Sequence, residues 1–278
     1  MKVLFIGDIV GEPGRRAVKE LVPKLRQTHK IDIVVANGEN CAPSGGGYKP
    51  AHVRELLNDV DCLTSGDHVW DQRDVYDIIN QEPRLLRPLN YPSGVSGKGS
   101  YIVHKDGKTL AVLNLQGRVF MQMNLENPFI AGRQEVDRLR KETKCILVDI
   151  HAETTSEKIA MGRFLDGHVS AVVGTHTHVA TADEHVMAHG TAFICDTGMT
   201  GPHESILGRE ADPIIKRFLT SMPQRFPVAV EDIRLNAVLI DIDEITGLAT
   251  SIVRICEKLT SVQPEVGEAF KKAFNLDA

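Results

Sequence analysis

The chain has 278 residues, of which 42% are hydrophobic and 25% charged, and its formal net charge is −5. These values predict a globular protein with a large core and no extended nucleic-acid surface. No apolar run reaches the roughly 18 residues of a spanning helix, and the N-terminal run is too short for a signal-peptide core, so we expect no membrane partner. Five cysteines without a Cys-x-x-Cys pair argue against disulfides or a thiolate zinc site and favour the cytoplasm.

Short apolar runs, each followed by a polar or glycine-rich turn, predict buried β-strands. In chain order these runs are Val3–Ile6, Ile33–Ala36, Cys62–Thr64, Ile146–Ile150 and Ala171–Val173. Helical spacing of apolar residues predicts helices between them. The predicted helices cover Val18–Leu25, which Pro23 should kink or restart, Val53–Val60 after Pro50, and a helix through Phe164 that Thr154-x-x-Glu157 opens as a capping box.

Two regions have the pattern of antiparallel strands. Tyr101–Leu115 predicts a hairpin around Asp106-Gly107, and Val228–Ile255 alternates with a turn near Thr246-Gly247. Strands alternating with helices indicate an α/β fold, so these two regions make its sheets mixed. Without a repeat or a clear linker, we predict one domain over residues 1–278, with 265–278 a short helix or a tail.

Metal-competent side chains follow each of the five predicted strands. Asp8 follows the first strand, and the others follow in the order Glu39-Asn40, Asp67-His68, His151 and His176-x-His178. Ligands of open α/β sheets bind at the carboxyl ends of parallel strands, so the fold should bring these groups together. Each group alone has an ordinary explanation, such as a helix cap for Asp8 or a surface pair for His176 and His178. Their joint position at strand ends indicates a site.

The donor set favours two metal ions. About seven oxygen and nitrogen donors are too many for one tetrahedral ion, and they suit two ions that share a bridging carboxylate. Such a pair lowers the pKa of a bridging water and binds a phosphoryl group for in-line attack. The residues therefore predict a two-metal phosphoesterase.

The motifs and their order resemble those of the calcineurin-like metallophosphoesterases, and in particular the YmdB-like branch. The shared strings extend over about residues 1 to 255: Phe5-Ile6-Gly7-Asp8, Asn37-Gly38-Glu39-Asn40, Gly66-Asp67-His68, Arg87-Pro88-Leu89-Asn90-Tyr91, His151-Ala152-Glu153-Thr154-Thr155-Ser156-Glu157-Lys158, Gly174-Thr175-His176-Thr177-His178-Val179 and Thr200-Gly201-Pro202.

The resemblance implies a four-layer α/β/β/α sandwich with mixed sheets, the metallo-dependent phosphatase fold. It implies that one metal binds Asp8, Asn40 and His178, that the other binds Asp67, His151 and His176, and that Glu39 bridges them. It further implies a phosphodiesterase of cyclic nucleotides, 2′,3′-cyclic ones in particular. In such an enzyme a metal-bridging hydroxide attacks phosphorus and His68 acts as general acid. Iron is the metal that it implies, with manganese as the alternative.

Two positions depart from the pattern of the wider superfamily. Val10 stands where a histidine ligand is usual, so Asn40 must supply that ligand, as the YmdB-like branch implies. Asp67 stands where an asparagine is usual, and its added charge should tighten binding and favour a more highly charged ion. Metal content and turnover of Asp67→Asn test this expectation.

Several features keep alternatives open. The same fold could serve a phosphomonoesterase or nucleotidase, and a weakly active metal-binding regulatory protein is the third alternative. Ser44–Gly47 is either a loop that approaches a phosphate or acts as a lid, or a flexible surface loop. Trp70 either stacks on a base or lies in the core. The sequence leaves a homo-oligomer open.

Overall fold

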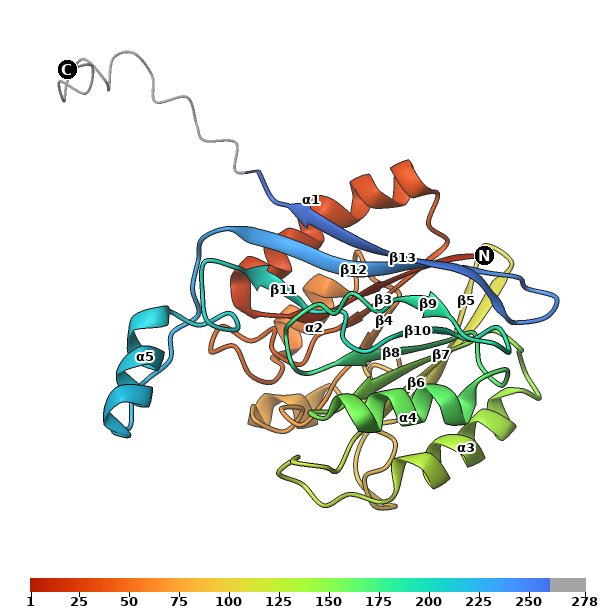
Figure 1. Cartoon of the computed structure of the whole chain (residues 1–278), viewed down its shortest axis with the longest axis horizontal. Coiled ribbons are helices and arrows are strands. Elements are labelled where there is room, and N and C mark those ends of the chain that lie inside the picture. Colours follow the sequence, from red (N-terminus) through yellow and green to blue (C-terminus); the bar gives the residue numbers. More distant parts are fainter. Residues whose placement is uncertain (261–278) are drawn as a thin grey trace, which may run out of the picture.

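The computed structural model describes residues 1–260, which form two mixed β-sheets with helices on both outer faces (Figure 1). The predicted tail, 265–278, lies outside the described residues. The first sheet has seven strands in the order β2-β11-β12-β1-β3-β4, with β13 paired to β12. Its strands are β1 (Lys2–Ile6), β2 (Asp8–Ile9), β3 (Ile33–Asn37), β4 (Cys62–Thr64), β11 (Met199–Pro202), β12 (Ile233–Ile242) and β13 (Ala249–Lys258).

The second sheet has six strands in the order β5-β6-β7-β8-β10-β9. They are β5 (Ser100–Lys105), β6 (Lys108–Gln116), β7 (Ile146–His151), β8 (Ala171–Thr175), β9 (His185–Val186) and β10 (Ala192–Ile194). In this sheet β6, β7, β8 and β10 run parallel, and β5 and β9 are antiparallel to their neighbours. The predicted mixed sheets and the hairpin around Asp106-Gly107 are therefore confirmed.

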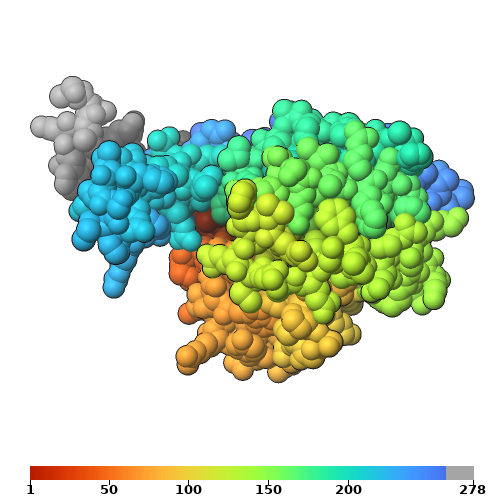
Figure 2. Space-filling model, turned by 60° about the horizontal axis from the view of Figure 1, so that its bottom comes forward, coloured from red at the N-terminus to blue at the C-terminus, as the bar shows by residue number. Residues whose placement is uncertain are grey.

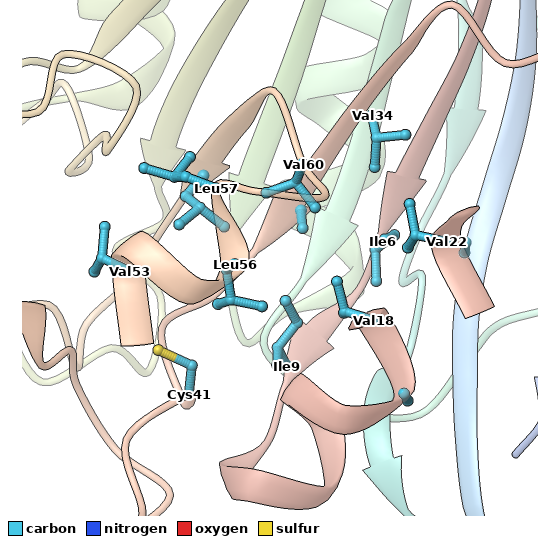
Figure 3. Packing of buried hydrophobic residues seen from close by; sticks show 14 of the residues in the cluster. Ile6, Ile9, Val18, Val22, Val34, Cys41, Val53, Leu56, Leu57 and Val60 are labelled. Atoms are coloured by element: carbon cyan, nitrogen blue, oxygen red, sulfur yellow. The ribbon is translucent and has the colours of Figure 1, made fainter. Parts of the chain in front are cut away.

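Helices cover the outer face of each sheet. Beside the first sheet lie α1 (Gly11–His29), α2 (Pro50–Leu56) and the short 3₁₀ helix η1 (Arg73–Asp77); beside the second lie α3 (Pro128–Leu139) and α4 (Thr155–Leu165). Figure 3 shows Val18 and Val22 of α1 turned toward Ile6 and Ile9. The order helix, sheet, sheet, helix is the predicted four-layer sandwich.

Alternation along β1 explains why its sequence is a continuous apolar run. Leu4 and Ile6 face the helices of the first outer layer, whereas Val3 and Phe5 face the second sheet. Side chains of a strand point alternately to its two faces, so burial on both faces requires apolar residues at every position. The same pattern over Ile33–Asn37 leaves the strand ends as the first places for polar side chains.

Two local expectations differ from the structure. Of the kink or restart predicted at Pro23, the restart does not occur, because helix α1 runs unbroken through this proline. Helix α4 begins after Thr154, but the Thr154 side chain makes no cap hydrogen bond. Glu157 instead accepts hydrogen bonds from the backbone N–H of Arg118 (3.0 Å) and of Val119 (3.2 Å), which follow β6. A tertiary partner therefore replaces the predicted capping box.

Residues 203–232, called the arm below, leave the first sheet between β11 and β12. The backbone N–H of His203 donates to the carbonyl of Asp232 at 3.0 Å and closes the base of the arm. The arm carries α5 (Ala211–Thr220), which stands apart from the four layers in Figure 1 and has no buried residue. None of the helices within residues 1–260 combines the length and apolar character needed to span a bilayer.

Candidate metal centre

The predicted ligands converge at one edge of the two sheets, where several parallel strands end. Donor atoms of Glu39, Asp67, His151 and His176 lie within 4.8 Å of one another, and those of Asp8, Glu39 and His178 form a second such group. Glu39 belongs to both groups. The structure thus brings together all the predicted carboxylate and histidine donors, in the two sets that the family resemblance implies.

The first group, called the core half, is compact. His151 Nε2 lies 3.1 Å from Glu39 Oε1 and 3.1 Å from Asp67 Oδ1. His176 Nδ1 lies 3.0 Å from His151 Nε2 and 3.4 Å from Asp67 Oδ1. His151 is the last residue of β7, and the other three follow directly on strand-end turns, so their backbones are fixed by the sheets.

The second group, together with Asn40, is called the arm half. Asn40 is the amide that was predicted to replace the usual histidine ligand. Asn40 Oδ1 lies 3.2 Å from His178 Nε2. Asp8 is fully buried on β2, and its Oδ2 accepts the backbone N–H of His176 at 3.1 Å. Val10 is buried as well, and its Cγ1 would lie 2.8 Å from a Cβ built on Gly208. The arm therefore packs where the superfamily histidine is expected.

A buried ion pair supports the turn that carries both histidines of β8. His176 and His178 have positive φ values of 97° and 65°, a region that side chains other than glycine rarely adopt. Thr177 between them donates its N–H (3.1 Å) and its hydroxyl (2.7 Å) to Asp196 Oδ2. Lys158 Nζ donates to the same oxygen at 2.8 Å. These bonds hold the turn in its strained form.

The residues present fit divalent metal ions. Asp8 Oδ1 is buried and has no hydrogen-bond partner within the described chain, although a buried carboxylate oxygen normally has one. A Cβ on Gly66 would lie 2.2 Å from His151 Nε2 and 2.3 Å from Glu39 Oε2, so this glycine leaves room for the donors to meet. Mixed carboxylate and imidazole donors suit iron, manganese and zinc.

Electrostatics agree with a cation site. Burial raises the pKa of Asp8. For Glu39 burial opposes ionisation, but the neighbouring His151 outweighs it and holds the pKa below its usual value. Burial also opposes ionisation of Asp67, but hydrogen bonds from His151 and His176 outweigh it and lower the pKa of Asp67 far below the usual range. Glu39 and Asp67 are therefore ionised at neutral pH and available as anionic ligands.

His151 is oriented by a buried chain of hydrogen bonds that the sequence analysis missed. Its Nδ1 lies 2.9 Å from Thr175 Oγ1, which donates to Asp149 Oδ1 at 2.7 Å. Thr64 Oγ1 donates to Asp149 Oδ2 at 2.6 Å. Burial raises the pKa of Asp149 to about 7. Nδ1 is engaged in this chain, so Nε2 is left for a metal. Asp149, an acidic residue inside the apolar run Ile146–Ile150, was the signal that could have revealed this chain of hydrogen bonds.

His176 has a partner of another kind. Its Nε2 lies 3.1 Å from Glu153 Oε2, while its Nδ1 faces the donors of the core half. The Glu153 side chain is 47% exposed. A carboxylate on the outer nitrogen of a ligating histidine fixes its ring and raises its basicity. No feature of the sequence singled out Glu153, which stands only two residues after His151.

His68 lies beside the donors without joining either group. Its backbone N–H points to Glu39 Oε2 at 3.4 Å, and its Nδ1 lies 2.8 Å from Asp71 Oδ2. Burial lowers the pKa of His68, but the carboxylates of Glu39, Asp67 and Asp71 together raise it above its usual value. A protonated imidazole at this place can donate a proton. Asp71 was not predicted, and its position three residues after His68 was the available signal.

The Ser44–Gly47 loop is packed against the site. Gly45 and Gly47 are buried, with φ values of 73° and 76°. A Cβ on Gly46 would lie 3.2 Å from Asp71 Oδ2, so the loop backbone approaches the partner of His68 closely. The carbonyl of Gly45 accepts from Asn40 Nδ2 at 3.2 Å. This loop therefore orients a predicted ligand, and the alternative of a flexible surface loop does not describe it.

A pocket with a volume of about 530 Å³ opens beside the donors, within the usual range of small-molecule sites. Its polar side includes His68, Glu153 and Arg209, and its apolar side comes from the arm: Ile206, Leu207, Ile214, Phe218 and Phe226. Figure 2 shows the hollow between the cyan arm and the body, with red atoms of the N-terminal segment at its floor. Trp70 stacks on Tyr76 and packs against the core instead of lining the pocket.

Known proteins are similar to this chain in sequence and in fold. The family of YmdB-like proteins matches residues 4–255. The 2′,3′-cyclic-nucleotide 2′-phosphodiesterase of Bacillus subtilis (strain 168) is 48% identical over 92% of this chain and 96% of its own. A crystal structure of a hypothetical protein from Thermus thermophilus has a TM-score of 0.87 and 39% identity, covering 94% of this chain and 100% of that one.

A crystal structure described as a novel phosphatase, from Mycoplasma pneumoniae, has a TM-score of 0.86 and 31% identity, covering 93% of both chains. The family match over residues 4–255 spans the positions of all the predicted ligands. The chain therefore belongs to the YmdB-like family and is a phosphoric ester hydrolase with the metallophosphoesterase fold.

Proposed function

We propose that this chain is a two-metal phosphodiesterase that hydrolyses 2′,3′-cyclic nucleotides. The observation that carries the proposal is the pair of donor groups that share Glu39, with His68 beside them in one pocket. The name of the Bacillus subtilis relative supplies the substrate class. The apolar side of the pocket, from Leu207 to Phe226, supports a substrate that carries a nucleobase next to its phosphate.

The proposed ligands divide as the geometry does. Asp8, Asn40 and His178 would hold one ion, Asp67, His151 and His176 the other, and Glu39 both. Two such ions supply an activated water and neutralise charge on the phosphoryl group. Water adds its oxygen to phosphorus, and the bond from phosphorus to the ribose oxygen breaks. His68 donates a proton to that leaving oxygen, and Asp71 holds its Nδ1 so that Nε2 is free for the transfer.

The charge of the site favours a diester over a monoester. Asp8, Glu39 and Asp67 would contribute three negative charges and the attacking hydroxide a fourth, which together balance the four positive charges of two divalent ions. A cyclic phosphodiester brings one further negative charge to this site, whereas a phosphomonoester brings about two near neutral pH. An asparagine at position 67 would leave one more positive charge, so Asp67 supports the diester.

Iron is the metal we propose, with manganese as the alternative. Imidazole and carboxylate donors accept either ion, and an additional carboxylate at position 67 favours the ion of higher charge. Metal analysis of the purified protein, followed by removal with a chelator and anaerobic reloading with iron or manganese, tests the identity. We expect iron to restore the higher turnover. A protein that carries zinc as purified and is active only with zinc would contradict this.

A substrate panel tests the activity. With the metals bound, we expect turnover of 2′,3′-cyclic AMP and little turnover of 2′-AMP, 3′-AMP or 5′-AMP. Faster hydrolysis of the monoesters would make the protein a phosphomonoesterase. Metal binding without turnover of any phosphoester would favour a regulatory role.

The role proposed for His68 has its own test. His68→Gln should slow hydrolysis of 2′,3′-cyclic AMP by about 100- to 10,000-fold, the usual contribution of a general acid. The same variant should lose far less on bis-p-nitrophenyl phosphate, whose leaving group needs no proton. Equal losses on both substrates would contradict acid catalysis by His68. Metal content measured in parallel separates a loss of ions from a loss of the acid.

A further inference from the structure

The arm contacts the body of the molecule directly at the metal centre. Helix α5 buries no residue, and Phe218 on it is 80% exposed. The part of the arm that packs closely is the turn around Leu207, in which Ile206 and Arg209 exchange backbone hydrogen bonds of 2.8 and 3.0 Å. Gly208 in this turn has φ +88°, and a Cβ there would lie 2.8 Å from Val10 Cγ1. The turn therefore packs against Val10, two residues after Asp8.

The same turn contacts a predicted metal ligand. The carbonyl of Leu207 lies 3.2 Å from His178 Nδ1, and His178 Nε2 faces Asn40 Oδ1. A ligating histidine that donates its outer N–H to a backbone carbonyl is held in one tautomer and one orientation. Leu207 itself has φ 52°, a conformation that persists only where the surroundings enforce it. The orientation of His178 therefore depends on what holds this turn.

Arg209 connects the turn to the Ser44–Gly47 loop. Its Nη1 donates to the carbonyls of Ser44 (2.5 Å) and Phe226 (3.1 Å), and its Nη2 to the carbonyl of Gly45 (2.5 Å). Burial lowers the pKa of Arg209, and no carboxylate in the described part of the chain forms a salt bridge with it. The guanidinium is thus engaged by backbone carbonyls alone. The carbonyl of Gly45 also accepts from Asn40 Nδ2, so Arg209 supports Asn40 as well.

We propose that Arg209 is the positioning residue for the metal ion of the arm half. One guanidinium joins the two segments that orient Asn40 and His178, and both belong to the same predicted half of the centre. The histidines of the core half, His151 and His176, form no hydrogen bond with the arm within residues 1–260. Loss of Arg209 should therefore weaken binding of the ion of the arm half and leave binding of the other ion unchanged. This inference rests on the proposed two-metal centre.

The experiment measures binding of Mn²⁺ to chelator-treated full-length protein by equilibrium dialysis with elemental analysis. We expect two ions per chain for the wild type. In Arg209→Met the tighter ion should bind as before, and the other should bind about 10- to 100-fold more weakly. Arg209→Lys should lie between, because its single nitrogen cannot reproduce the two separated nitrogens with which Arg209 reaches the three carbonyls. Arg217→Met is the matched control, since Arg217 lines the same pocket but within residues 1–260 donates only to Ser221, next to its own helix, and both ions should stay.

Several outcomes would overturn the inference. An equal loss of both ions in Arg209→Met would indicate a general structural role. Two tightly bound ions with a raised KM for 2′,3′-cyclic AMP would make Arg209 a substrate contact. Fewer than two ions in the wild type would instead overturn the two-metal centre, and the inference with it.

Thermal unfolding of the metal-free proteins controls for folding: Arg209→Met loses the hydrogen bonds of Arg209 to Ser44, Gly45 and Phe226, so we expect a modestly lower midpoint and a transition that stays cooperative. Gly208→Ala provides a second route if Arg209→Met does not fold. Its added methyl meets Val10 and shifts the turn, while the side chain of Arg209 remains unsubstituted. It should cause the same selective loss of one ion, and retention of both ions would contradict the proposal.

Discussion

The two halves of the metal centre share Glu39 but are built differently. In the core half, the histidine ligands are oriented by side chains, through Thr175 and Asp149 for His151 and through Glu153 for His176. In the arm half, the supports of Asn40 and His178 are the backbone carbonyls of Gly45 and Leu207. Those carbonyls lie on two loops, which Arg209 joins.

This difference has consequences for metal binding. Side chains within parallel strands are held by the sheet, so the core half should keep its geometry without metal. Loop backbone is more mobile than the strands that it connects. The arm half should therefore bind its ion more weakly and respond to changes in the arm. The predictions below would break or sharpen this contrast.

Loss of the shared ligand should have the largest effect. Glu39→Gln replaces the only predicted donor that both halves use, and it removes one negative charge from the centre that they share. We expect the affinity for each ion to fall by more than the roughly 10- to 100-fold that follows the loss of an outer hydrogen-bond partner. Dialysis against Mn²⁺ measures both affinities. Loss of a single ion would show that Glu39 does not bridge.

Thr175→Val should affect the core half alone. The valine keeps the shape but removes the hydroxyl between His151 and Asp149, so we expect the core ion to bind about 10- to 100-fold more weakly. Thr64→Val is the matched control, because Thr64 donates to the same carboxylate without contacting His151. Both variants should lower the free energy of unfolding by about 1–3 kcal/mol. If Thr64→Val also weakened the ion, the hydrogen bond to His151 would not be the cause.

Asp67→Asn should have an intermediate effect on the core half. Removing one negative charge should weaken the core ion by about tenfold, which corresponds to about 1.4 kcal/mol. The extra positive charge should also raise turnover of p-nitrophenyl phosphate relative to that of bis-p-nitrophenyl phosphate. Metal affinity and the ratio of the two rates are the measurements. If neither changed, the charge of Asp67 would have no role in the site.

The sequence predicted the fold and the convergence of the candidate ligands well because both depend on local pattern. Strands buried on two faces appear as apolar runs, and their ends are the first polar positions, so the pattern alone places Asp8 and His151 at one edge of the sheets. The capping role expected of Glu157 was wrong because a tertiary partner, the backbone after β6, competes for its carboxylate. Local pattern cannot reveal such a competitor.

The arm and the supports of the ligands could not be predicted for a related reason. Apolar residues of α5 recur at helical spacing, which is typical of a helix packed on a core, yet none of its residues is buried. Every residue has a backbone carbonyl, so no side chain in the sequence marks the carbonyls of Leu207 and Gly45 as supports. Glu153 acts only because the chain turns after β7 to bring it to His176.

Glu153→Gln should have the smallest effect and thereby sharpen the contrast within the core half. The Glu153 side chain is 47% exposed, and an exposed ion pair contributes at most about 1 kcal/mol, so the core ion should weaken by no more than about fivefold. The glutamine keeps an acceptor for His176 Nε2, and 1 M salt should abolish the remaining difference because it screens exposed charges. A loss of metal affinity as large as that of Thr175→Val would mean that burial does not decide how strongly an outer partner supports its ligand. The contrast between the two halves would then depend only on the kind of partner, which is a carboxylate or hydroxyl in the core half and a backbone carbonyl in the arm half.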